Sequence, residues 1–347
     1  MRCALIEYNH YHEETLPTLV RLLNTLGIEP DVYMTRRARR RQVFALASEL
    51  RFRLRRVERI DRLLGLPFRL HHYELLIVNS LEPLANLTRI SGSKTPLLGI
   101  VHNTELLSTE AAYRSFFSRP ERGLLVLGRH IANHLARGGE PVRWISQVYF
   151  GQPPPRRPDG PTTFAVSGNV EFTRRNYDSL LDAASELAQG GTPIRVRIVG
   201  RSTTRDGQTL RGEIKRRDLA SFELCRGEIP HLEYFQLVAG SDFALPLVDR
   251  TADRMRPYFK TKLASAIPLA IGLGVPLVIH RELADAYGVE ACGVVYEDGG
   301  LPEAMRTAIA SSERERAGWQ EALEATRADL FGASLANLRE AIAEVRA

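Results

Sequence analysis

Short apolar segments alternate with longer amphipathic ones along most of this chain, and this alternation restricts the fold more than any other feature. Cys3 to Glu7, Tyr73 to Asn79 and Pro96 to Val101 are apolar along nearly their whole length. Strands of this kind are buried on both faces, in parallel sheets that helices cover. We therefore predict an α/β protein with Rossmann-like, doubly wound sheets.

A segment rich in proline and glycine divides the alternation into two halves. Gly151 to Pro161 reads GQPPPRRPDGP and can continue neither a helix nor a central strand, and the α/β pattern restarts after it. A chain of 347 residues also fits two domains better than one. The predicted parts are an N-terminal domain (1–150), a linker (151–161), a second domain (162–330) and a C-terminal helix that packs back on the first domain (331–347).

The composition predicts a cytoplasmic protein. The three cysteines, Cys3, Cys225 and Cys292, lie far apart and form no CxxC pair, which fits a reducing compartment. The N-terminus turns polar after a short apolar run, so it does not read as a signal peptide. No apolar stretch approaches the roughly 20 residues that a membrane span needs.

The net charge of +6 is concentrated in one basic segment, Arg36 to Arg62. Apolar residues recur at helical spacing within and just after it, which predicts a helix with an apolar stripe and a basic remainder: Leu50, Leu54, Val57 and Leu64. Such a face suits an anionic membrane surface, where the protein would associate peripherally. A core-packed helix with solvated arginines is an equal alternative. No nucleic-acid partner is expected, because no nucleic-acid-binding motif accompanies the charge.

Polar loops follow the predicted strands of the second half. In open α/β sheets ligands bind beyond the carboxyl ends of the strands, so the predicted site is the cleft between the two domains. Lys260 to Ser265 would open a helix that runs from Leu263 to Leu273, and helix-start amides beside lysine and threonine bind anions. The remaining residues expected around a diphosphate are Gly168, Asn169, Arg174, Arg175 and Arg201. The alternative is that these cations are solvated or cap helices.

Histidines mark the loops of the first half. His10 and His12 follow the first strand, close to Glu7, Glu13 and Glu14, and His102 follows the strand Pro96 to Val101. A histidine near a carboxylate can act as a general base at neutral pH. The candidates for that role are His102, His10 and Glu13. A metal site on the HxH pair, which has no clear third ligand, and plain hydrogen bonding to a substrate are the alternatives.

Several enzyme classes are disfavoured by missing motifs. The first strand runs into IEYNHYHEE rather than GxGxxG, and the chain has no GxxxxGK[ST]. These absences disfavour a nicotinamide dehydrogenase and a P-loop kinase. No GxSxG elbow of an α/β hydrolase occurs either.

The second half resembles the donor domain of GT-B-fold glycosyltransferases of the family 4, or group 1, superfamily. The matching segments are FAVSGNVEFTRRNYDSLLDAASEL, IRVRIVG, CRGEIPHLEYFQLVAGSDFALPLVD and KTKLASAIPLAIGLGVPLVIHRELADAYG. The first half looks like the acceptor domain of that fold, with His102 at the strand end where many such enzymes place a histidine. The resemblance implies two Rossmann-like domains with an interdomain cleft.

The resemblance also implies roles for single residues. Gly168, Arg174 and Arg175 would contact the donor diphosphate, and the loop with Glu228 and Ile229 would lie beside the nucleotide base. The diphosphate would also be held around the last matching segment, by Tyr258, Lys260, Thr261, Lys262 and Ser265. No cofactor and no metal are expected.

One departure from the superfamily concerns its paired-glutamate motif, E-x7-E. Thr261 stands where the first glutamate would be and Leu269 where the second would be. The stereochemical outcome is therefore open, and hydroxyl and ammonium contacts would replace the carboxylate contacts to the donor.

The sequence thus leads to the hypothesis of a metal-independent glycosyltransferase. It would move a sugar from a nucleoside diphosphate sugar to a sugar, lipid-linked or other hydroxyl acceptor, in bacterial cell-surface polysaccharide or glycolipid synthesis. The alternatives are a nucleotide-sugar epimerase of the same fold and a non-catalytic scaffold at the inner face of the membrane.

Overall fold

The computed structural model describes residues 1–57, 70–137, 142–153, 160–225, 227–251 and 253–347. The chain divides into two compact units, each described by itself. Unit 1 comprises Met1–Gly151, Lys260–Leu263 and Asp329–Ala347, and unit 2 comprises Gln152–Phe259 and Ala264–Ala328. Both are parallel α/β units, which confirms the predicted fold class of two Rossmann-like domains.

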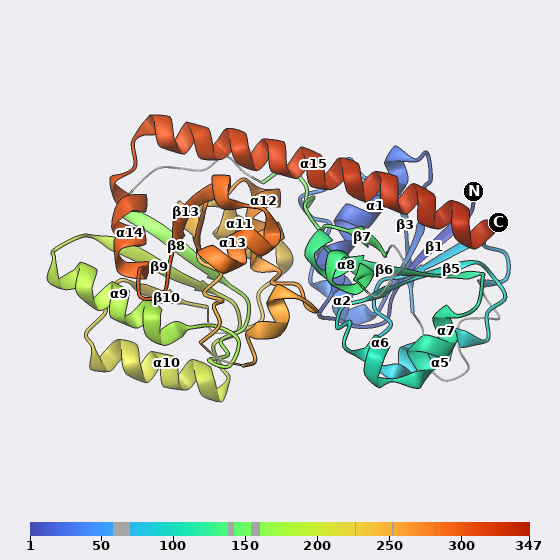
Figure 1. The fold of residues 1–347 in the computed structure, drawn as a ribbon, viewed down its shortest axis with the longest axis horizontal. Helices are drawn as coiled ribbons and strands as arrows, with labels where there is room; N and C mark the ends of the chain where they lie inside the picture. Colours follow the sequence, from blue (N-terminus) through green and yellow to red (C-terminus); the bar gives the residue numbers. More distant parts are fainter. Residues whose placement is uncertain (58–69, 138–141, 154–159, 226, 252) are drawn as a thin grey trace. The chain divides into compact units, whose positions relative to one another are not determined.

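The sheet of unit 1 has seven parallel strands among the described residues, in the order β3-β2-β1-β4-β5-β6-β7 (Figure 1). Its central strands are buried along their length, as their uniformly apolar sequences require. The strands are β1 (Cys3–Glu7), β2 (Asp31–Met34), β3 (Arg53–Arg56), β4 (Leu75–Val78), β5 (Leu97–Val101), β6 (Arg122–Leu127) and β7 (Arg143–Ile145).

Helices connect the strands of unit 1. Helix α1 (Leu16–Thr25) buries Leu16, Leu19, Leu22 and Leu23, and Gly27, which is left-handed at a φ of +76°, ends the turn after it. Helices α5 and α7 pack with β1, β4 and β5 in one core. The other bounds are α2 (Arg36–Arg40), α5 (Leu84–Ser91), α6 (Leu106–Thr109), α7 (Ala111–Phe117), α8 (Arg129–Ala136) and the 3-10 helix η1 (Glu13–Thr15).

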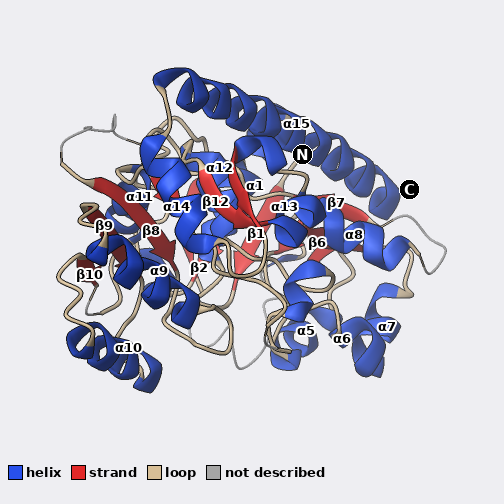
Figure 2. Cartoon of the chain, turned by 60° about the vertical axis from the view of Figure 1, so that its left-hand side comes forward, coloured by secondary structure: helices blue, strands red, loops and turns tan. Residues whose placement is uncertain are grey.

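The sheet of unit 2 has six parallel strands among the described residues, in the order β10-β9-β8-β11-β12-β13. Figure 2 shows strands in red between helices in blue, the arrangement expected of a doubly wound unit. The strands are β8 (Thr162–Ser167), β9 (Ile194–Val199), β10 (Phe222–Leu224), β11 (Phe243–Ala244), β12 (Leu277–His280) and β13 (Gly293–Tyr296).

Helices α9 and α14 pack together with β8 and β9 in the main core of unit 2. Asn176 caps α9 by accepting a hydrogen bond from the Ser179 N–H at 3.0 Å, which sets the start of that helix. The bounds are α9 (Tyr177–Gln189), α10 (Arg205–Arg216), α11 (His231–Ala239), α12 (Ala266–Leu273), α13 (Arg281–Tyr287), α14 (Leu301–Ala310), η2 (Arg256–Phe259) and η3 (Glu290–Cys292).

The last helix, α15 (Glu313–Arg346), is continuous through Gly332. A single exposed glycine costs a helix only about 1 kcal/mol, too little to interrupt it. Its final part belongs to unit 1, where Leu338 is fully buried and the Ser334 hydroxyl accepts the Ser146 N–H at 2.9 Å. Arg143 on β7 forms ion pairs of 2.6 Å with Glu340 and Glu344.

The amphipathic helix predicted for the basic segment is wrong in its described part. Arg53–Arg56 is an edge strand that pairs in parallel with β2, and Leu54 on it is 41% exposed. Backbone hydrogen bonding to the open edge of β2 decides this conformation, and Arg55 pairs with Asp31 across the two strands at 3.3 Å. Residues 58–69, including Leu64, lie outside the described residues.

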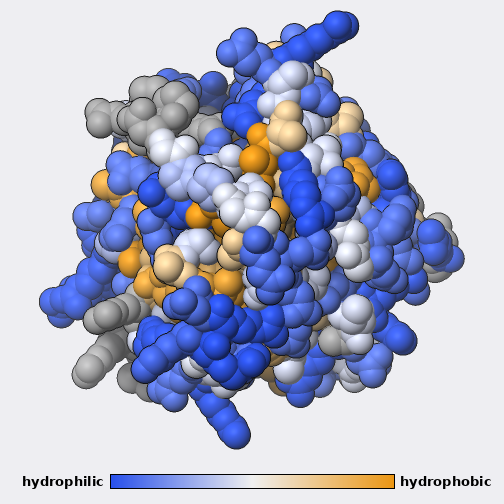
Figure 3. Space-filling view, turned by 90° about the vertical axis from the view of Figure 1, so that its left-hand side faces the viewer, coloured by the Kyte–Doolittle hydropathy of each residue, from blue (hydrophilic) through white to orange (hydrophobic). Residues whose placement is uncertain are grey.

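Within the part of the chain that the structure describes, no helix is long and apolar enough to cross a membrane. The face of the molecule drawn in Figure 3 is mostly hydrophilic, with apolar residues showing between polar ones.

Candidate functional site

The sheet of unit 1 reverses its strand order between β1 and β4, because β2 and β3 lie on one side of β1 and β4 to β7 on the other. Ligands of open parallel sheets bind beyond the carboxyl ends of the strands at such a point. Glu7 ends β1, and Asn79 and Ser80 follow β4; all three side chains are fully buried. Three polar side chains buried at the reversal point mark the candidate site of unit 1.

Three donors hold the Glu7 carboxylate. Oε1 accepts the backbone N–H of Asn9, and Oε2 accepts hydrogen bonds from Asn79 Nδ2 and, at 3.0 Å, from Ser80 Oγ. Burial raises the pKa of Glu7 to about 7, although these hydrogen bonds lower it. Because the loss of solvation outweighs the hydrogen bonds, this carboxyl changes its charge near neutral pH.

Two histidine rings stack beside this carboxylate. The ring centroids of His12 and His102 are 3.6 Å apart and their planes differ by 6°. His12 Nδ1 lies 2.9 Å from Ser80 Oγ, and His102 Nε2 lies 2.7 Å from the backbone oxygen of Asn79. Burial lowers the pKa of both rings, and His102 lowers that of His12 further. Both rings are therefore neutral at neutral pH, the form that can accept a proton.

Glu82 fixes the loop that carries His102. Its Oε1 accepts the backbone N–H groups of His102 at 2.7 Å and of Asn103 at 2.8 Å. The same carboxylate raises the pKa of the His102 ring, against the larger effect of burial. Glu82 thus positions the loop after β5 at the carboxyl end of the sheet.

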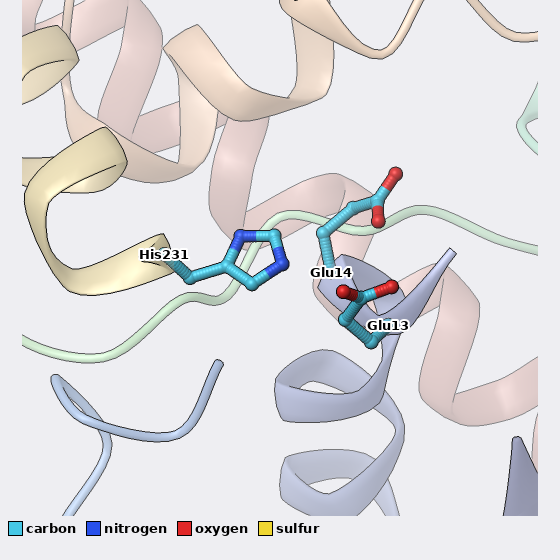
Figure 4. Close-up of side chains that lie close together, drawn as sticks. All are labelled: Glu13, Glu14 and His231. Carbon is cyan, nitrogen blue, oxygen red and sulfur yellow. The ribbon is translucent and has the colours of Figure 1, made fainter. Parts of the chain in front are cut away.

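The other two predicted catalytic residues make a different set of contacts. Glu13 and Glu14 lie in η1, where the chain enters α1 (Figure 4). Arg41 Nη1 lies 2.8 Å from the buried Glu13 Oε1 and donates to the backbone oxygen of His10 at 2.8 Å. Glu13 is thus engaged in an ion pair and His10 is anchored through its backbone, so a catalytic role for either stays a prediction.

The helix predicted to open at Lys260 begins later, because α12 starts at Ala266 with Ser265 at its N-cap position. Pro268 gives the physical reason. In a helix that began earlier, its ring would clash with the carbonyl of Ala264 and would supply no N–H, whereas proline is tolerated in the first turn. The prediction that Lys260 to Ser265 open this helix therefore holds for Ser265 and is wrong for Lys260 to Leu263.

The segment Lys260–Leu263 is instead part of unit 1 and pairs with the loop after β5. The Thr261 carbonyl accepts hydrogen bonds from the backbone N–H of Thr104 at 3.2 Å and from its hydroxyl at 3.0 Å. Thr261 Oγ1 donates to Glu105 at 3.1 Å, and Lys262 Nζ lies 3.8 Å from the same carboxylate. The Glu105 carboxylate therefore lies beside the positive charge of Lys262, which the sequence predicts to bind a diphosphate.

The sheet of unit 2 reverses between β8 and β11. Gly168 follows β8 at a φ of +100°, which L side chains rarely adopt, and a Cβ at Gly200 would lie 2.1 Å from the Gly168 oxygen. Glycine at both positions lets the ends of β8 and β9 approach each other without side chains between them. That approach is suited to a ligand that contacts backbone groups.

Two of the predicted donor arginines make side-chain contacts within unit 2, and most of the other predicted donor residues are exposed. Arg175 donates to the backbone oxygens of Ser167 at 2.6 Å and Asn169 at 2.9 Å, so it holds the turn at Gly168. Arg174 pairs with Glu171 at 2.8 Å. Asn169, Arg201, Glu228, Lys260 and Ser265 are exposed, and Ile229 and Tyr258 are partly exposed.

The structure adds Asp249 to the reversal point of unit 2. This buried carboxylate follows β11 and accepts hydrogen bonds from Asn176 Nδ2 at 2.7 Å and from the Thr251 N–H at 2.9 Å. It links the start of α9 to the loop after β11. The signal in the sequence is an aspartate directly after an apolar run, which sequence reasoning did not select.

The sequence placed Glu7 and His12 beside the candidate bases but gave neither a role, and it gave none to Asn79 or Ser80. Each lies at or just after a strand end, so the signal was present. Which strand ends are neighbours depends on the strand order, and the sequence pattern does not contain that order.

Comparisons with known proteins find relatives in structure alone. No family model and no curated protein matches the sequence. A glycosyltransferase from Rickettsia africae ESF-5 has a TM-score of 0.63 and 9% identity, over 99% of this chain and 98% of that chain. HepE from Anabaena, solved in complex with UDP, has a TM-score of 0.65 and 14% identity, over 98% of both chains. WaaG, a glycosyltransferase involved in lipopolysaccharide biosynthesis, has a TM-score of 0.57 and 12% identity, over 99% of both chains.

Proposed function

We propose that this protein is a glycosyltransferase that moves a sugar from a nucleoside diphosphate sugar to a hydroxyl acceptor. The supporting observation is the fold that it shares, over 98% or more of its length, with the three glycosyltransferases above. HepE was solved with UDP, which supports a nucleotide donor. Because one fold hosts many functions, the proposal also rests on the chemistry of the two sites.

We assign the donor to unit 2. Gly168 leaves the end of β8 without a side chain, and Asn169 and Arg201 are exposed in the loops after β8 and β9. The Arg201 guanidinium would neutralise charge that develops on the leaving diphosphate. A donor contact of Lys260 and Lys262, which belong to unit 1, stays a prediction from the sequence. In this proposal cationic side chains, rather than a metal ion, stabilise the leaving group.

We assign the acceptor to unit 1. The site at the reversal point offers neutral imidazoles beside a buried carboxyl, groups that can orient a hydroxyl and remove its proton. His102 is one of three residues that the sequence predicts for this chemistry, with His10 and Glu13, and its ring stacks on that of His12. The acceptor hydroxyl would therefore be activated by the loops after β1, β4 and β5.

The donor assignment is tested by nucleotide binding. Uridine, thymidine, guanosine and adenosine diphosphates are each added while the melting temperature is followed, and one of them should raise it. Arg201→Ala should weaken that binding about tenfold or more, since a charge-assisted hydrogen bond contributes about 1.5–3 kcal/mol. Arg216→Ala is the matched control, because Arg216 pairs with Glu213 on the surface of α10 and should leave binding unchanged.

Two results would contradict the proposal. One is that no nucleoside diphosphate binds, and the other is that Arg201→Ala and Arg216→Ala bind alike. Product analysis separates the alternatives: a transferase releases a nucleoside diphosphate and forms a glycoside, whereas an epimerase does neither. Binding to membranes without any donor turnover would instead favour the scaffold.

The acceptor is proposed to be lipid-linked, in cell-surface polysaccharide or glycolipid synthesis at the cytoplasmic face of the membrane. The exposed arginines of α2 and β3 support contact with anionic lipid, at about 1 kcal/mol each: Arg36, Arg37, Arg39, Arg40, Arg53, Arg55 and Arg56. The protein should therefore sediment with anionic but not with neutral vesicles. Replacing Arg36, Arg39 and Arg40 by glutamine should weaken that binding, and equal binding to both vesicle types would refute the contact.

A further inference from the structure

A carboxyl, a hydroxyl and an imidazole form one hydrogen-bonded chain in unit 1. Glu7 Oε2 lies 3.0 Å from Ser80 Oγ, and Ser80 Oγ lies 2.9 Å from His12 Nδ1. Glu7 and Ser80 are fully buried, whereas the His12 ring is partly exposed. Among the described residues, His12 Nε2 has no hydrogen-bond partner. The chain therefore leads from a buried carboxyl to a partly exposed histidine.

Hydrogen-bond chemistry links the charge of Glu7 to the tautomer of His12. When Glu7 is ionised it can only accept, so the Ser80 hydroxyl donates to it and must accept the Nδ1–H of His12. The lone pair of His12 is then on Nε2. When Glu7 carries a proton on Oε2, or a glutamine with its amide nitrogen toward Ser80 replaces it, the Ser80 hydroxyl accepts from residue 7 and donates to His12 Nδ1, so His12 carries its proton on Nε2.

We propose that His12 removes the proton from the acceptor hydroxyl, and that Glu7, acting through Ser80, holds His12 in the tautomer that can do so. This inference rests on the proposed glycosyl transfer and names a residue that the sequence did not assign. His12 is the catalytic residue in this arrangement, and Glu7 and Ser80 are positioning residues.

The proton transfers balance along the chain. As the acceptor oxygen attacks the anomeric carbon, the bond from that carbon to the phosphate oxygen breaks, and its electron pair leaves with the nucleoside diphosphate. The acceptor proton passes to His12 Nε2. The Nδ1 proton can then move to Ser80 Oγ while the Ser80 proton moves to Glu7. The product is a glycoside, a nucleoside diphosphate and a protonated Glu7, which returns its proton to solvent.

The contacts of His102 favour a supporting role beside His12, and not the role of the general base. Its Nε2 lies 2.7 Å from the Asn79 carbonyl, which can only accept, so that nitrogen keeps its hydrogen. The shortest hydrogen bond of His102 is thus to a neutral amide, and Ser80 Oγ lies farther from its Nε2, at 3.3 Å. Ser80 Oγ lies 2.9 Å from His12 Nδ1 and donates to the Glu7 carboxylate, which stabilises an imidazolium better than an amide does. Stacking at 3.6 Å fixes the plane of the His12 ring.

The first test reads the tautomer without any substrate. Long-range proton–nitrogen NMR spectra of histidine-labelled protein distinguish Nδ1–H from Nε2–H rings, and the His12 signals are assigned by their loss in His12→Gln. Above pH 8 the wild type should hold His12 as Nδ1–H, and Glu7→Gln should convert it to Nε2–H. Glu74→Gln is the matched control. Glu74 precedes β4, at the amino end of that strand, whereas Glu7 and Ser80 lie at the carboxyl ends, so this substitution should leave the tautomer unchanged.

The second test measures the rate of sugar transfer. Glu7→Gln and Ser80→Ala should each lower kcat for sugar transfer about 100-fold or more with little change in KM, because the base is lost while binding stays. Ser80→Ala keeps the hydrogen bond from Asn79 to Glu7, so it serves if Glu7→Gln does not fold. Donor binding to unit 2 should persist in both variants and shows that they are folded.

The results separate this inference from the function itself. If wild-type protein transfers no sugar but shows the tautomer switch, the assigned reaction is wrong and the hydrogen-bonded chain is right. If transfer occurs but Glu7→Gln leaves the His12 tautomer or kcat unchanged, the chain has no role and the inference is overturned.

Discussion

At the residue scale, the Glu7 carboxyl shows how one buried group can act on both stability and activity. Burial raises its pKa from an ordinary value of 4.5 to about 7. Between these two values the folded protein binds more protons than the unfolded chain, so the free energy of unfolding falls as pH rises. The charged form that activity requires is thus the form that folding disfavours, a trade-off common at functional sites.

We predict opposite pH dependences for stability and turnover over this range. From pH 5 to 8 the stability advantage of wild type over Glu7→Gln should shrink, by about 3 kcal/mol at most. Over the same range kcat/KM of the wild type should rise and level off above about pH 7. Urea unfolding and initial rates measure the two, and a stability difference that grows with pH would contradict the assignment. The groups around Glu7 are His12, Glu13 and Ser80, with His102 and Glu82 beside them. Glu14 also interacts with Glu7, and burial raises the pKa of Glu14 to about 8, so it titrates above the range of Glu7.

At the element scale, β3 shows where a spacing argument fails. Leu50, Leu54 and Val57 have the spacing of a helix face, yet Arg53–Arg56 forms a strand. Leu50 and Val57 are buried and Leu54 is exposed, so the three do not share a face. The open edge of β2 offers a row of backbone partners, and pairing with it outweighs the helix propensity of arginine and leucine, a difference of less than about 1 kcal/mol per residue. The charged side chains also protect this edge from pairing with another chain.

Helix α15 supports a prediction at the same scale, because its last turns complete unit 1. Leu338 is fully buried there, so Leu338→Ala should lower the free energy of unfolding of unit 1 by about 2–5 kcal/mol. Arg339→Ala, at the exposed neighbouring position, should change it by less than about 0.5 kcal/mol. Urea unfolding followed by fluorescence measures both. Equal effects of the two substitutions would show that the end of α15 does not pack on unit 1.

At the scale of the whole molecule, the chain carries a separate reporter in each unit. Its two tryptophans are Trp144 in unit 1 and Trp319 in unit 2. Trp144 packs among Val126 and Ile131, and Trp319 packs against Phe243. Each unit has its own core, so the two can unfold in separate steps.

We predict that a nucleoside diphosphate stabilises the two units unequally. In Trp144→Phe, fluorescence follows unit 2 through Trp319, and the nucleotide should raise the unfolding midpoint by mass action. In Trp319→Phe, fluorescence follows unit 1 and the midpoint should move less. A larger shift in unit 1 would place the donor there and reverse the assignment of the two units.

The sequence by itself determined the class of the fold and most of its elements. Apolar strands are local patterns, so β1 covers the predicted Cys3 to Glu7, and β5 ends at the predicted Val101. It also placed His102 and Gly168 at strand ends. These results depend on residues that are near each other in the chain, which is the information a periodic pattern carries.

Only the tertiary structure decided which of those strand ends meet. Strand order brings Glu7, Ser80 and His12 together, although Ser80 is 68 positions from His12. Lys260–Leu263, predicted as a helix start in the second half, belongs to unit 1 because of its tertiary contacts. Part of the basic segment, predicted as a helix, is an edge strand because it pairs with β2. The physical reason is the same in each case: pairing of backbone groups and burial of polar side chains depend on partners distant in sequence, which no local pattern specifies.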